Sequence, residues 1–186
     1  MKKTMLIILS CFLISSLAAN ESKRHSGKDS AEYISWNDLK INNELTLLTT
    51  KSAMYKLFSK PDSTVNPNLD EICGSYFEDN FKYVFFGKTM FEVSGNQVVL
   101  SAVQFDGKNK SKLVSPKITF DNSLTIEKYA KTFPQSAKNR KEVLHSIIGK
   151  TICVRLATSK TDATDTQWHL YFTKGRLVRF ELWMPC

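Results

Sequence analysis

The chain lacks the motifs that mark most nucleotide-binding and metal-binding enzymes. It has seven glycines in 186 residues, and neither GxxxxGK nor GxGxxG occurs, so the glycine-rich loops that cradle phosphates are missing. Its four cysteines and three histidines do not cluster at the short spacings of a zinc site. No serine, cysteine or carboxylate is placed by the sequence to complete a nucleophile–base–orienter set. We therefore expect a protein that is not an enzyme, with no cofactor and no metal.

Dense basic helices and aromatic ladders are also missing, which excludes nucleic acid as the expected partner. The formal net charge is +8, but many lysines sit in the polar stretches "SKRHSGKDS" and "DGKNKSKL". There they keep loops solvated. A basic exported protein can also favour anionic surfaces such as lipid headgroups.

Only one long apolar run is present, from Met5 to Ile14, after two lysines and before small residues. It is too short for a membrane span and is typical of a secretory signal, so we predict a signal peptide at 1–18. The competing interpretation is a lipoprotein anchored through Cys11, and either one predicts export to the periplasm or beyond. The polar, aperiodic residues 19–32 predict a disordered leader.

Two stretches repeat one order of elements. A helical pattern in "TTKSAMYKLFSKPDS" ends at Pro61 and precedes the strand patterns of "FKYVFFGKTMFEVSGNQVVLSAVQF". A second helical pattern in "SLTIEKYAKTFPQS" ends at Pro134 and precedes "TICVRLA" and a terminal hairpin. We predict an α+β fold of two tandem pseudo-repeats, 33–107 and 117–186, joined by a linker at 108–116. Each repeat is expected to pack a helical segment on an antiparallel sheet.

The terminal hairpin "WHLYFTKGRLVRFELWMPC" allows two registers. A two-residue loop of Lys174 and Gly175 would mix polar and apolar side chains on both faces. A three-residue loop with Gly175 in the left-handed region pairs Leu170 with Val178 and Trp168 with Phe180. We predict this second register, because it gives one apolar face made of Trp168, Leu170, Phe172, Val178, Phe180, Leu182 and Met184.

The opposite face of the same hairpin predicts the binding site. It carries side-chain types that often supply binding energy on a rigid sheet: His169, Tyr171, Arg179, Glu181 and Trp183. The same register in the earlier hairpin places Asn96 in the left-handed turn position and adds Met90, Glu92, Leu100 and Gln104 to this face. The competing interpretation is that a second layer covers these residues.

The order of helix and antiparallel sheet, "LFSKPDS" after the first helix and the strand-turn-strand "YFTKGRLVRFELW" together resemble the beta-lactamase-inhibitor-protein-like fold. That resemblance covers residues 40–186 and implies two units side by side with one concave sheet surface. It carries over no partner residues. A single cystatin-like or nuclear-transport-factor-like sheet around one helix is the alternative fold.

Three cysteines follow the predicted signal, and two of them are expected to pair in an oxidising compartment. Cys73 lies in a loop-like segment and Cys186 follows the last strand, so we predict a Cys73–Cys186 disulfide. The alternative is Cys153 with Cys186, if their strands are neighbours.

These observations predict an exported binding module whose partner is another exported or envelope protein, with membrane attachment only if Cys11 is lipidated. Two alternatives stay open: an envelope structural lipoprotein, and a hydrolase-like enzyme that uses His169.

Overall fold

The computed structural model describes residues 32–68, 72, 74–161 and 166–185. The predicted signal peptide, nearly all of the predicted leader, Cys11, Cys73 and Cys186 lie outside the described residues. Among the residues that are described, no helix is long and apolar enough to cross a membrane.

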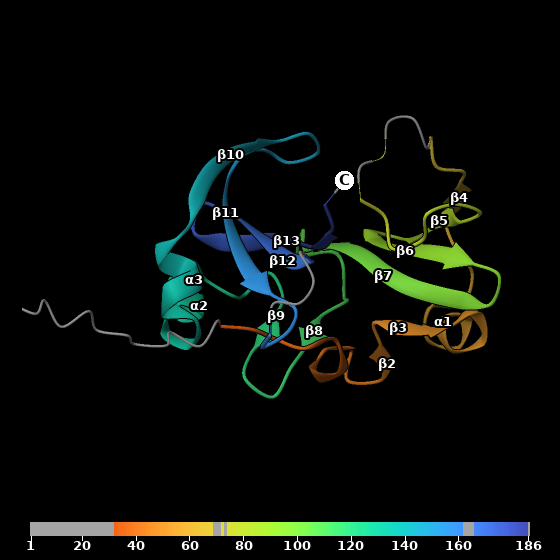
Figure 1. Ribbon diagram of the computed structural model, residues 1–186, viewed down its shortest axis with the longest axis horizontal. Helices are drawn as coiled ribbons and strands as arrows, with labels where there is room; N and C mark the ends of the chain where they lie inside the picture. The colour runs from red at the N-terminus through yellow and green to blue at the C-terminus, as the bar shows by residue number, and fades with distance from the viewer. Residues whose placement is uncertain (1–31, 69–71, 73, 162–165, 186) are drawn as a thin grey trace, which may run out of the picture.

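The fold is dominated by a nine-stranded antiparallel sheet (Figure 1). Eight strands follow the spatial order β10-β11-β12-β13-β7-β6-β5-β4, and β3 also pairs with β7. Their bounds are β3 (Leu48–Thr50), β4 (Ser63–Val65), β5 (Lys82–Phe86), β6 (Thr89–Ser94), β7 (Gln97–Gln104), β10 (Lys141–His145), β11 (Gly149–Ala157), β12 (Gln167–Thr173) and β13 (Arg176–Trp183).

Chain order is kept within each half of this sheet. Strands β4 to β7 form one antiparallel series and β10 to β13 form another, and the two series meet where their last strands pair. At this seam Gln104 lies opposite Arg179, Val103 opposite Phe180, and Ala102 opposite Glu181. Side chains that alternate along β7 and β13 therefore contribute to the same two faces of one continuous sheet.

One face of the main sheet is covered by a second layer that contains the short helices and a small four-stranded sheet (Figure 1). The buried hydrophobic cluster between the layers is continuous and includes residues from both halves, such as Phe91 and Trp168. The covering elements are η1 (Trp36–Asp38), β1 (Lys40–Ile41), β2 (Leu45–Thr46), α1 (Lys51–Phe58), β8 (Leu113–Val114), β9 (Thr119–Phe120), α2 (Ile126–Thr132) and α3 (Pro134–Lys138). We call the face of the main sheet toward this layer the core face and the opposite one the second face. A mostly antiparallel sheet with few helices agrees with the α+β class predicted above.

Both predicted helical patterns form helices, and each begins at a capping threonine. The Thr50 hydroxyl accepts from the Ala53 amide at the start of α1, and Thr125 accepts from Lys128 at the start of α2. Pro134 follows α2, as predicted, and also begins α3, because proline is well suited to the first turn of a helix.

The predicted register of the terminal hairpin is wrong. Thr173 lies opposite Arg176, so the loop has two residues, Lys174 and Gly175, whose φ values of 50° and 74° are both left-handed. The extra residue sits in β13 instead of the turn, as a bulge at Val178. Gly175 does adopt the left-handed conformation that the sequence predicted for it.

This bulge changes the pairs but keeps the predicted faces beyond it. Leu170 lies opposite Phe180 and Trp168 opposite Leu182, and the Trp168 and Phe180 rings are 5.3 Å apart on the core face. Next to the turn the prediction fails, because Leu177 is buried in the core in place of Val178.

The same error affects the earlier hairpin. Ser94 lies opposite Gln97, and the left-handed position of the loop is taken by Gly95, with φ 55°, instead of Asn96. A bulge in β7 at Ser101 restores the pattern beyond it. Leu100, which was predicted on the second face, therefore belongs to the core cluster.

Candidate functional site

The second face of β12 and β13 brings together all five side chains predicted as a binding site. His169 lies opposite Glu181 and Tyr171 lies opposite Arg179 across the hairpin. Trp183 lies at the end of β13 and stacks on the His169 ring, with 5.3 Å between ring centroids and 9° between planes. Cross-strand neighbours on one face lie close enough for these contacts.

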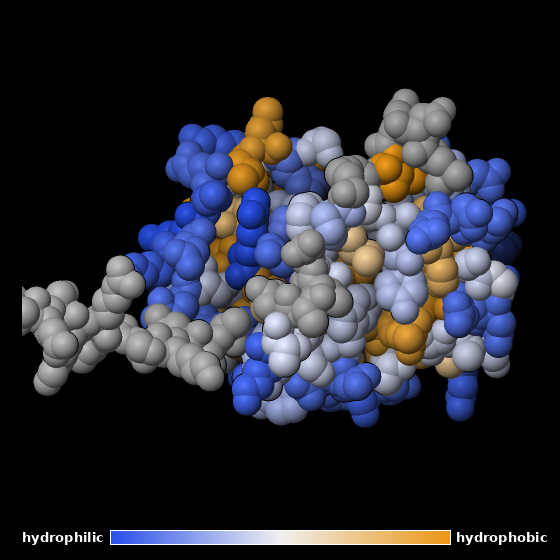
Figure 2. Space-filling view, viewed as in Figure 1, coloured by the Kyte–Doolittle hydropathy of each residue, from blue (hydrophilic) through white to orange (hydrophobic). Residues whose placement is uncertain are grey.

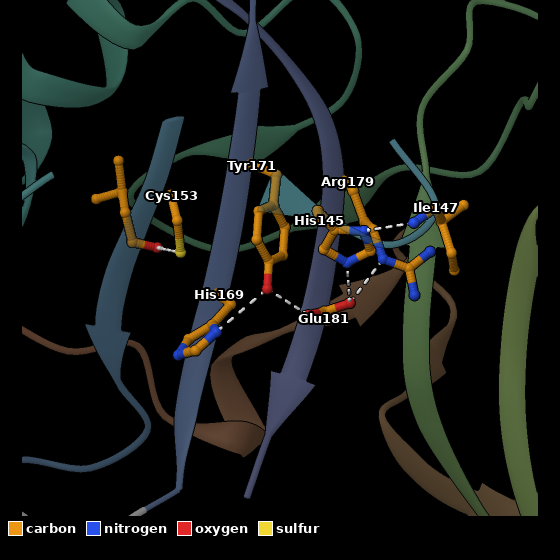
Figure 3. A network of polar contacts seen from close by, with 8 residues as sticks. His145, Ile147, Cys153, His169, Tyr171, Arg179 and Glu181 are labelled. Carbon is orange, nitrogen blue, oxygen red and sulfur yellow. Dashed lines mark hydrogen bonds and ion pairs between the residues drawn. The ribbon is translucent and has the colours of Figure 1, made fainter. Parts of the chain in front are cut away.

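A chain of polar contacts joins four members of this group, all except Trp183 (Figure 3). The Tyr171 hydroxyl donates to Glu181 Oε1 at 2.5 Å, and Arg179 Nε donates to Glu181 Oε2 at 2.6 Å. His169 Nδ1 lies 3.3 Å from the Tyr171 oxygen. Because the tyrosine gives its one hydrogen to Glu181, its oxygen is left to accept the Nδ1–H of a neutral His169.

His145 is a further member that was not predicted from the sequence. Its Nε2 lies 3.5 Å from Glu181 Oε2, and its ring packs edge-on with the Tyr171 ring, with 4.6 Å between the ring centroids. Its Nδ1 accepts the backbone N–H of Ile147 at 3.0 Å, which fixes the turn after β10. β10 has no clear strand signal in the sequence, because "KEVLH" does not alternate between polar and apolar residues and neither glycine nor proline precedes it.

Glu181 is ionised in this setting. Burial alone would raise the pKa of Glu181, but the Arg179 guanidinium and the hydrogen bonds from Tyr171 and Arg179 outweigh burial and lower it. Burial first, and then the Glu181 charge, raise the pKa of Tyr171. The tyrosine therefore keeps its proton and serves as a donor to the carboxylate.

His169 is neutral at physiological pH. Burial, assisted by the Arg155 charge and opposed by Glu181, lowers the pKa of His169 to about 4. Its Nε2 is buried without a hydrogen-bond partner among the described residues. The imidazole thus keeps an unused acceptor nitrogen.

Cys153 lies opposite Tyr171 in β11 and is a free, buried thiol. Burial raises the pKa of Cys153 to about 11, so the thiol is protonated at neutral pH and is a poor nucleophile. Among the described residues, no group of three or more His, Cys, Asp or Glu side chains could hold a metal ion.

The predicted surface is divided between buried and exposed residues. His169, Tyr171 and Arg179 are 5%, 6% and 7% exposed, whereas Trp183 is 39% exposed. The first three belong to a packed layer, and Trp183 forms its exposed rim. The two interpretations left open by the sequence, binding surface and covered layer, therefore apply to different members of the group.

A covering segment also crosses the second face of the first half. Glu92 is buried, and its carboxylate accepts the backbone N–H groups of Tyr76 at 2.8 Å and Phe77 at 3.3 Å. Burial raises the pKa of Glu92, although these two hydrogen bonds act against the shift. Met90 and Gln104 are half-buried on the same face. No local signal in the sequence placed residues 74–81 over this part of the sheet.

The start of this segment touches the end of β13. Gly74 adopts φ +74°, and a Cβ built on it would lie 2.0 Å from the Met184 carbonyl oxygen, so only glycine fits. Beside this contact is a hollow of about 310 Å³ whose apolar lining includes Trp36, Leu48, Tyr76 and Met184. Met184 follows Trp183, so the hollow lies at the end of β13, although Trp183 itself does not line it.

No protein-family model, curated protein or solved structure matches the chain. The likeness to the beta-lactamase-inhibitor-protein-like fold stays a prediction from the sequence.

Proposed function

We propose that the protein is an exported binding module that holds a partner, another exported or envelope protein, against the rim of the second face. The observation that carries the proposal is the position of Trp183. Its side chain is 39% exposed and stacks on a histidine that is itself fixed by a buried polar network. An exposed aromatic on a rigid support buries a large area in a complex at low entropic cost.

The hollow at the end of β13 supports the same location. Its lining includes Met184, the residue after Trp183, and also Leu48 and Tyr76, which are 49% and 37% exposed. An aromatic anchor beside a recess is a common arrangement at the centre of protein interfaces. The inner residues Tyr171 and Arg179 would support the site and would not themselves contact the partner.

Capture of the partner tests this proposal. Immobilised wild-type protein, Trp183→Ala and Tyr55→Ala are incubated with envelope extract, and captured proteins are quantified by mass spectrometry. Tyr55 is the matched control because it is an aromatic of the same 39% exposure, on helix α1. We expect one captured species to fall at least tenfold with Trp183→Ala and to stay unchanged with Tyr55→Ala. Equal capture by both variants would reject Trp183 as the anchor.

Export is part of the proposal, with cleavage after residue 18 as the expected processing. Mass spectrometry of the mature N-terminus distinguishes a free Ala19 from an acylated Cys11. An acylated Cys11 would instead favour the envelope-lipoprotein alternative.

We also propose that the two halves of the main sheet are tandem repeats. Each half is preceded by a short capped helix, each runs through four antiparallel strands in chain order, and each last strand carries one bulge. Failure of the two series to superpose strand for strand would contradict a duplication.

A further inference from the structure

The turn of the β10–β11 hairpin carries the two most exposed large apolar side chains among the described residues. Leu144 is 85% exposed and Ile147 is 62% exposed. Figure 2 shows an apolar projection at the top of the molecule, in the region of this hairpin, with hydrophilic residues around it. Single exposed apolar residues are common on protein surfaces, but two within four positions at a projecting turn form a local patch.

This turn is held in place by specific contacts. Five residue pairs join β10 to β11, up to His145 opposite Gly149. The His145 ring accepts the Ile147 N–H and also contacts Glu181 and Tyr171 on the main sheet. The buried network therefore fixes a turn whose aliphatic side chains point away from the core. Leu144 and Ile147 are therefore exposed on an ordered part of the fold.

Basic residues lie along the hairpin that carries the projection. The exposed cationic side chains on α3, β10 and β11 and in the connection before β10 are Lys138, Arg140, Lys141, Lys150 and Arg155, of which Lys150 lies opposite Leu144 beside the turn. The acidic side chain among them, Glu142, pairs with Lys150 at 3.1 Å, with both side chains largely in solvent. Lys174 lines the same hollow as Lys150 and adds a further positive charge.

An anionic lipid surface matches this combination of shape and charge. A convex aliphatic tip can enter the boundary between headgroups and acyl chains without a preformed pocket, while lysine and arginine side chains contact lipid phosphates. A protein partner would need both a pocket for the tip and carboxylates around it. The structure of the hairpin therefore favours a membrane over a protein at this position.

We propose that the β10–β11 turn docks the protein on anionic membranes by inserting Leu144 and Ile147 into the lipid interface, with Lys150 and the other basic residues of the hairpin on the headgroups. This docking uses a different surface from the partner site around Trp183 and does not depend on it. It also needs no lipid attached at Cys11.

Vesicle co-sedimentation tests the proposal on the mature chain, prepared without residues 1–18 so that Cys11 cannot be acylated. The vesicles are phosphatidylglycerol–phosphatidylethanolamine mixtures, with pure phosphatidylcholine as the neutral comparison. We expect binding to the anionic vesicles alone, falling steeply with added salt. Replacing Lys141 or Lys150 with Gln should weaken it about fivefold each, as expected for one basic residue near an anionic surface.

The apolar contribution is tested with the double variant Leu144→Ser/Ile147→Ser. Its matched control is Val65→Ser, because Val65 is also an exposed aliphatic, on edge strand β4 at the other end of the sheet. The double variant should bind anionic vesicles at least tenfold more weakly, and Val65→Ser should bind as the wild type does. All these side chains are exposed, so circular dichroism should be unchanged. Failure of the wild type to bind, equal binding to neutral vesicles, or undiminished binding by the double variant would each overturn the proposal.

Discussion

Acid sensitivity of the fold follows from His169. The imidazole is buried and its pKa falls from 6.5 to about 4, so the folded state binds fewer protons than the unfolded state between these two values. Stability is therefore lost as the pH falls through this window, and it is fully present above the unfolded pKa. Integrating the linkage relation from pH 7.5 to pH 5 gives a loss of about 2 kcal/mol in the free energy of unfolding.

The matched variant is His169→Phe, which keeps an aromatic ring against Trp183 and removes the titrating group. At pH 7.5 we expect it to be about 1 kcal/mol less stable than the wild type, because Tyr171 loses the hydrogen bond from Nδ1. At pH 5 the difference should reverse. Urea unfolding at both values measures the free energies, and the wild-type midpoint should fall by about 1 M more than that of the variant.

The pH range separates His169 from its neighbours. Glu181 has a lowered pKa, so its own contribution is lost only as the pH falls below about 4.5 and through its folded pKa. His145 faces the same carboxylate, and it is present in both proteins. Comparing the two proteins therefore isolates His169. If His169→Phe loses as much stability as the wild type between pH 7.5 and 5, the assignment of a buried neutral imidazole is wrong.

Two other predictions concern the same hairpin and its end. Tyr171→Phe keeps the ring but removes the donor to Glu181, so thermal unfolding should show a loss of about 1 to 3 kcal/mol in the free energy of unfolding. Trp183→Ala should lower it by less than about 1 kcal/mol. The reverse order would contradict the division into packed layer and rim. For the cysteines, a non-reducing peptide map should link Cys73 to Cys186, since Gly74, one residue after Cys73, is in contact with Met184, two residues before Cys186. Cys153 should be alkylated only after unfolding. A peptide joining Cys153 to either partner would refute that pairing.

The faces of the hairpins could be predicted from the sequence better than their registers. A polar residue at one position and an apolar one at the next fixes which side of a strand meets the core, and this placed Arg179, Glu181 and Trp183 on the second face correctly. An extra residue in the turn and an extra residue in a bulge assign the residues farther along the strand to the same faces. The turn was therefore predicted with three residues, while the chain uses two and a bulge at Val178.

The covering of the second face could not be predicted, because it depends on contacts far apart in the sequence. Glu92 is buried by backbone N–H groups 15 and 16 positions away, and His145 reaches Glu181 from another strand. Nothing in the residues around Glu92 or Glu181 indicates these partners. The alternation along each strand was enough to group the candidate site residues on one face. Their exposure depended on which loops pack over that face, and those loops have no periodic pattern in the sequence.

The seam between β7 and β13 has a consequence for how the chain folds. Within each half, every neighbouring strand is also the next in sequence, so most ladders form between segments that are close along the chain. The seam instead joins residues 102–104 to residues 179–181, in three pairs only. Bringing these two distant segments together costs more conformational entropy than closing any of the hairpins, and fewer hydrogen bonds offset that cost. We expect the two halves to acquire their hairpins early and the seam to form late, so that amides of the seam exchange with solvent faster than those in the β12–β13 ladder. A slow step in refolding would then report the joining of two preformed sheets along one short edge.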